Sequence, residues 1–186
     1  MSGLEVRFES PSAIPQPPSE GEDSRWYAVH TMARHEKRVA QHLLVSGVPT
    51  FLPLMQQIHQ WSDRRAKVEV PLFSCYAFVR IIQTTAQRLK VLRTPGVNGF
   101  VGSERVGTPI PNEEIEYLQK AVREKIPLAV HPFLTAGKRV RIRGGALDGV
   151  EGILVGRAGD KSLVVSVELL QRSVSIRVEG YHLELA

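Results

Sequence analysis

The stretch that decides the fold is GKRVRIRGGALDGVEG, residues 137–152. Val140 and Ile142 alternate with basic side chains, which is the period-two pattern of a strand with one buried face. Four glycines then punctuate the stretch: Gly144, Gly145, Gly149 and Gly152. Gly149 and Gly152 are expected to adopt backbone angles that a Cβ would hinder. The stretch therefore predicts a strand, a tight glycine loop and a second strand.

The same texture continues to the end of the sequence. Val174, Ile176 and Val178 alternate with polar residues, and apolar runs occupy 153–155 and 163–170. Short strands at regular spacing with glycine turns predict a small all-β barrel. The β-branched residues also disfavour a helical alternative here.

The chain upstream mixes strand and helix patterns. An apolar strand is expected over 26–30, and a helix from Ala33 that ends at Gly47 and Pro49. The buried stripe expected for this helix is Val39, Ala40, Leu43 and Leu44. Strand propensity is strong over 68–82, and 97–101 is a further strand. A second helix opens at Pro111 and Asn112, with a stripe of Ile115, Leu118 and Val122. This order predicts an α+β sandwich.

Composition divides the chain into four parts. Residues 1–23 hold one basic and five acidic side chains, a net charge of −4, and four prolines, so a disordered acidic tail is expected. We expect domains at 24–127 and 133–186, joined by a linker at 128–132 between Pro127 and Pro132. The amino terminus lacks a signal-peptide pattern, and no apolar run approaches the roughly 20 residues that span a bilayer. One cysteine, Cys75, excludes an internal disulfide, so a cytoplasmic location is expected.

The charge of residues 24–126 favours binding near nucleic acid, and the motifs expected of an enzyme are missing from the sequence. Residues 24–126 hold 15 basic and 8 acidic side chains, a net charge of +7, although a solubilising surface would carry the same charge. The six histidines show no metal-ligand spacing with Cys75 or with carboxylates. No Walker loop or nucleophile elbow is present. We therefore expect no enzyme, no metal and no cofactor.

Two segments together carry a family resemblance. The stretch at 137–152 resembles the KOW motif that opens SH3-like barrels in NusG and in several ribosomal proteins. Residues 71–79, PLFSCYAFV, resemble the signature strand of the NusG amino-terminal domain, with Ser74 and Cys75 where the family has Pro-Gly. The resemblance covers 25–186. It implies a NusG-type amino-terminal α/β sandwich followed by an SH3-like KOW barrel.

The resemblance also implies a function. A NusG-like protein is a monomeric transcription elongation factor that binds the clamp helices of the largest RNA polymerase subunit and suppresses pausing and termination. Its KOW domain recruits a second partner, either Rho or a ribosomal small-subunit protein. The polymerase-binding residues implied by position are Phe73, Tyr76, Tyr27, Leu72 and Phe100, of which Leu72 and Phe100 are expected to be core supports. The alternative is that both Phe73 and Tyr76 are core.

Specialised relatives of the RfaH and UpxY kinds also touch the non-template DNA strand with a basic helix face. The altered signature strand and the acidic tail favour such a paralogue. The implied nucleic-acid residues are Arg34, Arg38, His42, Arg93, Thr94, Arg64, Arg65 and Lys67. The implied partner-binding tip of the barrel is Leu169, Leu170 and Arg172. The alternatives are a solvated helix face, a buried aliphatic pair, and an RNA- or ribosome-binding KOW protein without polymerase activity.

Overall fold

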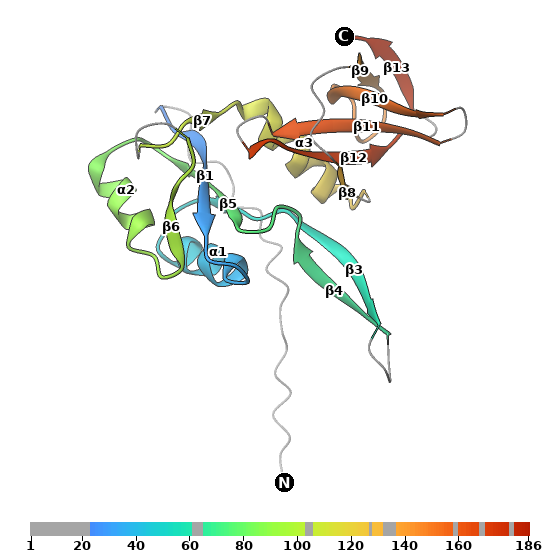
Figure 1. Cartoon of the computed structure of the whole chain (residues 1–186). Helices are drawn as coiled ribbons and strands as arrows, with labels where there is room; N and C mark the ends of the chain where they lie inside the picture. The colour runs from blue at the N-terminus through green and yellow to red at the C-terminus, as the bar shows by residue number, and fades with distance from the viewer. Residues whose placement is uncertain are drawn as a thin grey trace, which may run out of the picture.

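The computed structural model describes residues 23–60, 65–102, 106–126, 128–131, 137–157, 160–167, 170–178 and 181–186. Its amino-terminal part contains, in chain order, β1 (Arg25–Thr31), α1 (Glu36–Val45), β2 (Thr50–Phe51), β3 (Leu54–Gln60), β4 (Arg65–Pro71), β5 (Tyr76–Ile81), α2 (Thr85–Leu92), β6 (Val97–Phe100), β7 (Pro109–Ile110) and α3 (Asn112–Arg123). Its carboxyl-terminal part contains β8 (Leu128–His131), β9 (Lys138–Arg143), β10 (Glu151–Arg157), β11 (Asp160–Val167), β12 (Arg172–Arg177) and β13 (His182–Leu185). The α+β class and the all-β carboxyl-terminal unit, hereafter the barrel, are confirmed (Figure 1).

β1 is a central strand of the amino-terminal sheet, which has the order β2-β5-β1-β6, with β7 also paired to β1. Successive side chains of β1 point to opposite faces of the sheet. Trp26 and Ala28 belong to the apolar cluster that includes α3. Tyr27 and Val29 belong to the cluster that includes residues of α1 and α2. The sheet is therefore covered on both faces, which makes the predicted sandwich.

α1 begins later than its apolar pattern predicts. The helix starts at Glu36 rather than Ala33, because Arg34 has a φ of +65°, in the left-handed region that a right-handed helix cannot use. Val39, Ala40 and Leu43 are buried as predicted. The prediction for Leu44 was wrong, since its side chain is 37% exposed.

The strand expected over 68–82 is two strands, β4 and β5, separated by a tight loop. The loop contains Cys75, whose φ of +67° interrupts extended backbone. β4 pairs instead with β3, from Leu54 opposite Pro71 to Gln60 opposite Arg65. The two strands form a separate ribbon that projects from the sandwich (Figure 1). The polar segment expected over 56–67 thus contributes most of this hairpin.

α2 is an element that the sequence pattern did not predict. Its amino-terminal cap is Thr84, whose hydroxyl accepts a hydrogen bond from the Gln87 N–H at 3.3 Å. The Gln87 side chain accepts in turn from the Ile82 N–H at 3.1 Å. The Thr84 bond satisfies one of the donors left open at a helix start, and the Gln87 side chain ties the helix to the residues just before it. Val91 packs α2 on the same face of the sheet as α1, since it shares a buried cluster with Val39 and Leu43.

The barrel strands follow the order β13-β9-β10-β11-β12-β8. Val140 and Ile142 are buried, as the opening stretch predicts. Gly149 has a φ of +84°, as the opening stretch predicts, whereas Gly152 does not have the left-handed φ expected of it. Gly152 is required by a close approach instead, because a Cβ there would lie 2.4 Å from the Val164 carbonyl oxygen. β8 falls inside the expected linker and pairs with β12, from Leu128 opposite Ile176 to His131 opposite Ser173.

α3 lies between the sandwich and the barrel (Figure 1). It begins at Asn112, as predicted, and buries Ile115, Leu118 and Ala121. These residues share one apolar cluster with Trp26 of β1 and with Val165 of the barrel strand β11. The Lys120 ammonium also donates a hydrogen bond to the Asp148 carbonyl oxygen, across to the barrel. One helix therefore contributes to the packing of both units.

Candidate functional site

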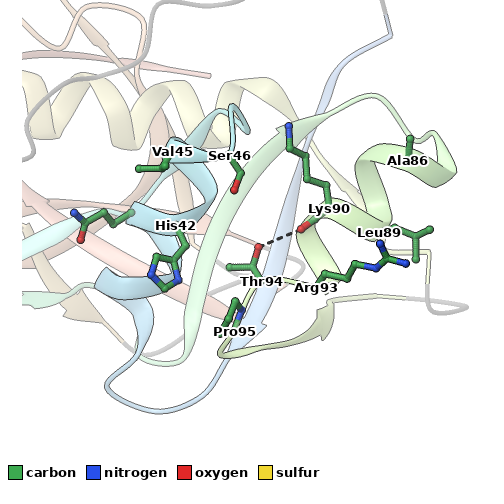
Figure 2. Close-up of a pocket in the computed structure, with 10 residues that line it drawn as sticks. His42, Val45, Ser46, Ala86, Leu89, Lys90, Arg93, Thr94 and Pro95 are labelled. Atoms are coloured by element: carbon green, nitrogen blue, oxygen red, sulfur yellow. Dashed lines mark hydrogen bonds between the residues drawn. The ribbon is translucent and has the colours of Figure 1, made fainter.

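A groove of about 920 Å³ lies between α1 and α2 (Figure 2). His42, Val45 and Ser46 line it from the α1 side, and Ala86, Leu89, Lys90 and Arg93 line it from the α2 side. The remaining lining residues are Gln41, Thr94 and Pro95. The shared face of the sheet holds the two helices together, since Leu43 of α1 and Val91 of α2 belong to one buried cluster.

The groove combines exposed aliphatic side chains with cations. Val45 is 83% exposed and Leu89 42% exposed. Lys90 and Arg93 are exposed on α2 and its carboxyl-terminal cap, opposite His42. The Lys90 ammonium reaches toward the carboxyl end of α1, where it would lie 3.8 Å from a Cβ on Gly47. A cation is favoured there because the open carbonyl groups give a helix a negative carboxyl end.

Three of the predicted nucleic-acid residues, His42, Arg93 and Thr94, line this groove. Arg38 and His42 are exposed one turn apart on α1, and Arg34 is exposed in the loop before it. His42 and Arg93 also line the groove. Thr94 is different, since it is only 7% exposed and its hydroxyl donates to the Lys90 carbonyl oxygen at 3.1 Å. The structure thus brings His42 and Arg93 together at one groove, with the buried Thr94 beside them, and places Arg34 and Arg38 at the start of α1.

The hairpin residues are only partly placed. Arg64 lies outside the described residues, and the side chain of Arg65 is likewise not described. Lys67 is exposed on β4, which belongs to the ribbon rather than to the α1–α2 groove. Of the three cations predicted on this ribbon, Lys67 is therefore the one whose side chain the structure describes.

The aromatic residues of the signature strand divide between core and surface. Phe73 is 3% exposed and packs edge-on against Phe78, with ring centroids 5.8 Å apart. Leu72 is also 3% exposed. Tyr76, in contrast, is half-buried, and its ring lies 5.5 Å from the exposed imidazole of His30. Tyr76 rather than Phe73 is thus the ring that this segment presents to solvent.

The two other predicted docking residues support the sheet from the α1 side. Tyr27 is 4% exposed, and its ring is edge-on to Phe100 with centroids 6.1 Å apart. Phe100 is half-buried and packs against the α1–α2 cluster. Phe100 thus packs against the core from a partly exposed position, and Tyr27 lies within the core.

The loop before Tyr76 is fastened to α1. The Cys75 N–H donates to the Glu36 Oε1 at 2.8 Å, and Glu36 is only 5% exposed. A hydrogen bond to a carboxylate is stronger than one between neutral groups. Glu36 therefore fixes the position of the loop that carries Tyr76 relative to the helix that carries Arg38 and His42.

A second cavity, of about 440 Å³, lies between α3 and the barrel. Tyr117 of α3 faces Glu151 of β10 there, and Arg141 of β9 is paired with the same carboxylate. Burial raises the pKa of the Tyr117 phenol above its usual value, and the Glu151 carboxylate raises it further. Burial and the Glu151 carboxylate therefore favour the neutral phenol and outweigh the Arg141 guanidinium, which lowers the pKa.

The predicted barrel tip is described in part. Leu169 lies outside the described residues. Leu170 is 7% exposed and belongs to the apolar cluster, whereas Arg172 is exposed at the start of β12. Of the three, Arg172 is the described side chain that a partner can reach.

The sequence pattern missed Lys90, Leu89 and Val45, because it did not predict α2 and treated α1 as a basic face alone. The usable signal was Thr84 followed three residues later by Gln87, a capping pattern at a helix start. Within the described part of the chain, no group of three or more histidine, cysteine or acidic residues could hold a metal ion. No helix among those residues is long and apolar enough to cross a bilayer.

The sandwich coincides with a known sequence family. The family described as "Transcription termination factor nusG" matches residues 24–119. The chain belongs to the NusG family. "Transcription termination/antitermination protein NusG" of Staphylococcus aureus strain COL is 30% identical over 175 residues, covering 86% of this chain and 94% of that protein. The same protein of strain Newman gives the same values.

A solved NusG structure shows the same fold. The structure titled "Domain interaction in Thermotoga maritima NusG" has a TM-score of 0.54 and 22% sequence identity, and the match covers 88% of this chain and 97% of that one. The NusG resemblance predicted from the KOW-like stretch and the signature strand is confirmed. This family consists of non-enzymatic transcription termination and antitermination factors.

Proposed function

We propose that this chain is a transcription elongation factor that binds the clamp helices of the largest RNA polymerase subunit and suppresses pausing and termination. It acts in the cytoplasm as a monomer, without catalysis or a cofactor. The observation that carries the proposal is the half-exposed Tyr76 at the signature strand of a NusG-family sandwich. Aromatic side chains that their neighbours hold in place are frequent anchors of protein interfaces.

The docking surface in this proposal centres on Tyr76 and the adjacent His30. Phe73, Leu72 and Tyr27 lie beneath or behind it and hold the strand in place. The His30 ring also contacts Asn98 through its Nδ1, at 3.1 Å, so both rings of the pair are positioned by neighbours. A pre-positioned aromatic pair loses little side-chain entropy on binding.

The basic face of α1 is proposed to contact the displaced non-template DNA strand. Arg34, Arg38 and His42 offer exposed cations or hydrogen-bond donors, and Arg93 extends the face across to α2. Cationic surfaces that follow the phosphate backbone hold single strands without a catalytic site. Thr94 supports this face through the Lys90 carbonyl oxygen, and Lys67 adds a cation on the ribbon.

The barrel is proposed to recruit a second partner, Rho or a ribosomal small-subunit protein, through the region of Arg172. The exposed guanidinium would make the contact, and the buried Leu170 would hold the turn before it. A pull-down of each purified candidate with the full chain, compared with Arg172→Glu, tests this assignment. Capture of neither candidate would remove the recruiting role.

The decisive experiment is transcription in vitro with purified polymerase on templates that carry pause and termination sites. We expect the full chain to shorten pauses, and Tyr76→Ala to lose most of that effect while keeping its circular dichroism spectrum. Leu185→Ala, at an apolar residue 71% exposed on β13, is the matched control and should retain full activity. Unchanged pausing with the native chain would refute the proposal. Polymerase-independent RNA or ribosome binding would instead support the KOW-protein alternative.

A further inference from the structure

The α1–α2 groove has exposed apolar side chains that binding to DNA does not explain. Val45 and Leu89 are large aliphatic side chains left exposed on either side of it. Single-stranded nucleic acid is usually held by aromatic rings on which bases stack. Among the ten lining residues the imidazole of His42 is the one aromatic ring. The apolar surface of the groove therefore fits the side chains of a peptide better than it fits bases.

The positive charge of the groove indicates which kind of peptide would bind there. None of the ten described residues that line it is acidic, and Lys90 and Arg93 stand on its α2 side. A fitting occupant thus combines apolar side chains with a net negative charge. Complementary charge of this kind guides association and fixes register.

Residues 4–9 of the same chain have that combination. They read Leu4-Glu5-Val6-Arg7-Phe8-Glu9, so apolar and charged side chains alternate. In an extended segment this alternation places Leu4, Val6 and Phe8 on one side and the charges on the other. The segment belongs to the acidic stretch 1–23, whose net charge is −4.

The connection is long enough and starts close by. β1 begins at Arg25, which pairs with Ile81, and α2 begins at Thr85, four residues after that partner. The connection from Glu9 to Asp23 spans up to about 46 Å when extended. α2, with eight residues, is only about 12 Å long. A tether of this kind also gives the segment an effective concentration in the range of about a millimolar, so a weak contact is enough.

We propose that residues 4–9 of this chain dock in the α1–α2 groove and shield its cations. Leu4, Val6 and Phe8 contact the aliphatic surface of Val45 and Leu89. Glu5 and Glu9 lie on the outer side of the segment, where the long, exposed side chains of Lys90 and Arg93 reach them from the edge of the groove. His42 and Arg93 also belong to the proposed DNA-binding face, so an occupied groove competes with DNA for them. The docking of residues 4–9 does not depend on the proposed function. The competition with DNA does, because it rests on the proposed DNA-binding face.

Paramagnetic broadening in the full chain tests the docking directly. Ser10→Cys in a Cys75→Gly background carries a single thiol for a spin label beside the segment. We expect strong broadening of the amide signals of Val45, Leu89 and Arg93, and none in β9 of the barrel. Broadening elsewhere, or none that is selective, would overturn the proposal. The same broadening in isotope-enriched chain that carries no spin label, when it is mixed with spin-labelled chain that is not enriched, would assign the groove to a second copy and overturn the proposal equally.

Charge and side-chain variants separate docking from a chance encounter. Leu4→Ser with Phe8→Ser, and separately Lys90→Glu with Arg93→Glu, should each abolish the broadening. Arg172→Glu makes the same charge change on the exposed surface of the barrel and should leave it intact. Broadening that survives both double variants would mean that these contacts do not hold the segment.

Binding of a fluorescent oligothymidine measures the competition. An effective concentration of twice the dissociation constant of the segment weakens DNA binding about threefold, so Leu4→Ser with Phe8→Ser should strengthen it by that factor. If the broadening is present but no form of the chain binds the oligonucleotide, the DNA role fails and the docking stands. If the oligonucleotide binds but the broadening is absent, the docking fails and the DNA role stands.

Discussion

Cys75 holds a backbone conformation that its own side chain disfavours. Its φ is +67°, a region in which any residue with a Cβ is strained by about 1–2 kcal/mol. The Glu36 carboxylate stabilises this conformation, because it accepts the Cys75 N–H at 2.8 Å from a buried position. The Tyr76 N–H also donates to the Phe73 carbonyl oxygen at 3.2 Å, so α1 and the loop itself both hold the turn.

Cys75→Gly is expected to be more stable than Cys75→Ala by about 1 kcal/mol, because glycine alone escapes the Cβ penalty. At an ordinary position the order is reversed, since glycine is less stable than alanine by roughly 0.5–1 kcal/mol. Urea unfolding followed by tryptophan fluorescence measures the difference, because Trp26 is buried in the sandwich. An alanine variant at least as stable as the glycine variant would show that the loop relaxes out of this conformation.

The same turn explains why the sequence could locate the docking strand but not orient its rings. Phe73 and Tyr76 both stand out in the segment at 71–79. An alternating pattern predicts which side chains share a face only while the backbone stays extended. Residues three apart would lie on opposite faces of an unbroken strand, but the left-handed residue between Phe73 and Tyr76 lets both pack against one apolar cluster. Phe73 is buried there on Phe78, and Tyr76 lies at its edge beside His30.

Helices and strands were predictable where an apolar pattern ran over many consecutive residues. α3 has a full apolar stripe with acidic residues in its first turn, and its start at Asn112 was predicted correctly. α2 was missed because it has eight residues and buries one of them, Val91. β8 was missed because its pairing with β12 joins residues more than 40 positions apart, which no local pattern records.

The short helix α2 is expected to depend on its cap. Thr84→Ala removes the oxygen that accepts the Gln87 N–H, and loss of such a cap destabilises a helix by about 0.5–2 kcal/mol. We expect faster hydrogen exchange at the amides of Leu89 and Lys90, with little change in α3. Thr85→Ala is the matched control, since Thr85 is exposed and lies one residue inside the cap. Equal exchange in the two variants would contradict the importance of the cap.

The arrangement of the whole molecule was the least accessible to sequence. The NusG-type sandwich and the barrel were each predictable from their own patterns, whereas their boundaries at 24–127 and 133–186 stay predictions. The contact between α3 and the barrel brings Tyr117 to Glu151 and Lys120 to the Asp148 carbonyl. Each of these polar groups could equally be satisfied by water. The sequence therefore gives no separate signal for the contact.

This contact is expected to weaken at alkaline pH through Tyr117. Burial, with the Glu151 carboxylate, raises the pKa of the phenol in the folded chain above its usual value of 10.0. A group with a raised folded pKa contributes stability that is complete below the unfolded pKa and is lost as pH rises through the folded one. Tyr117→Phe should therefore match the native chain near neutral pH in urea unfolding and exceed it above the usual tyrosine pKa. The phenolate absorbance difference between the two chains reports the titration itself. If the phenolate absorbance of Tyr117 instead appears at or below that usual pKa, the phenol does not face Glu151 in solution, and α3 and the barrel separate there.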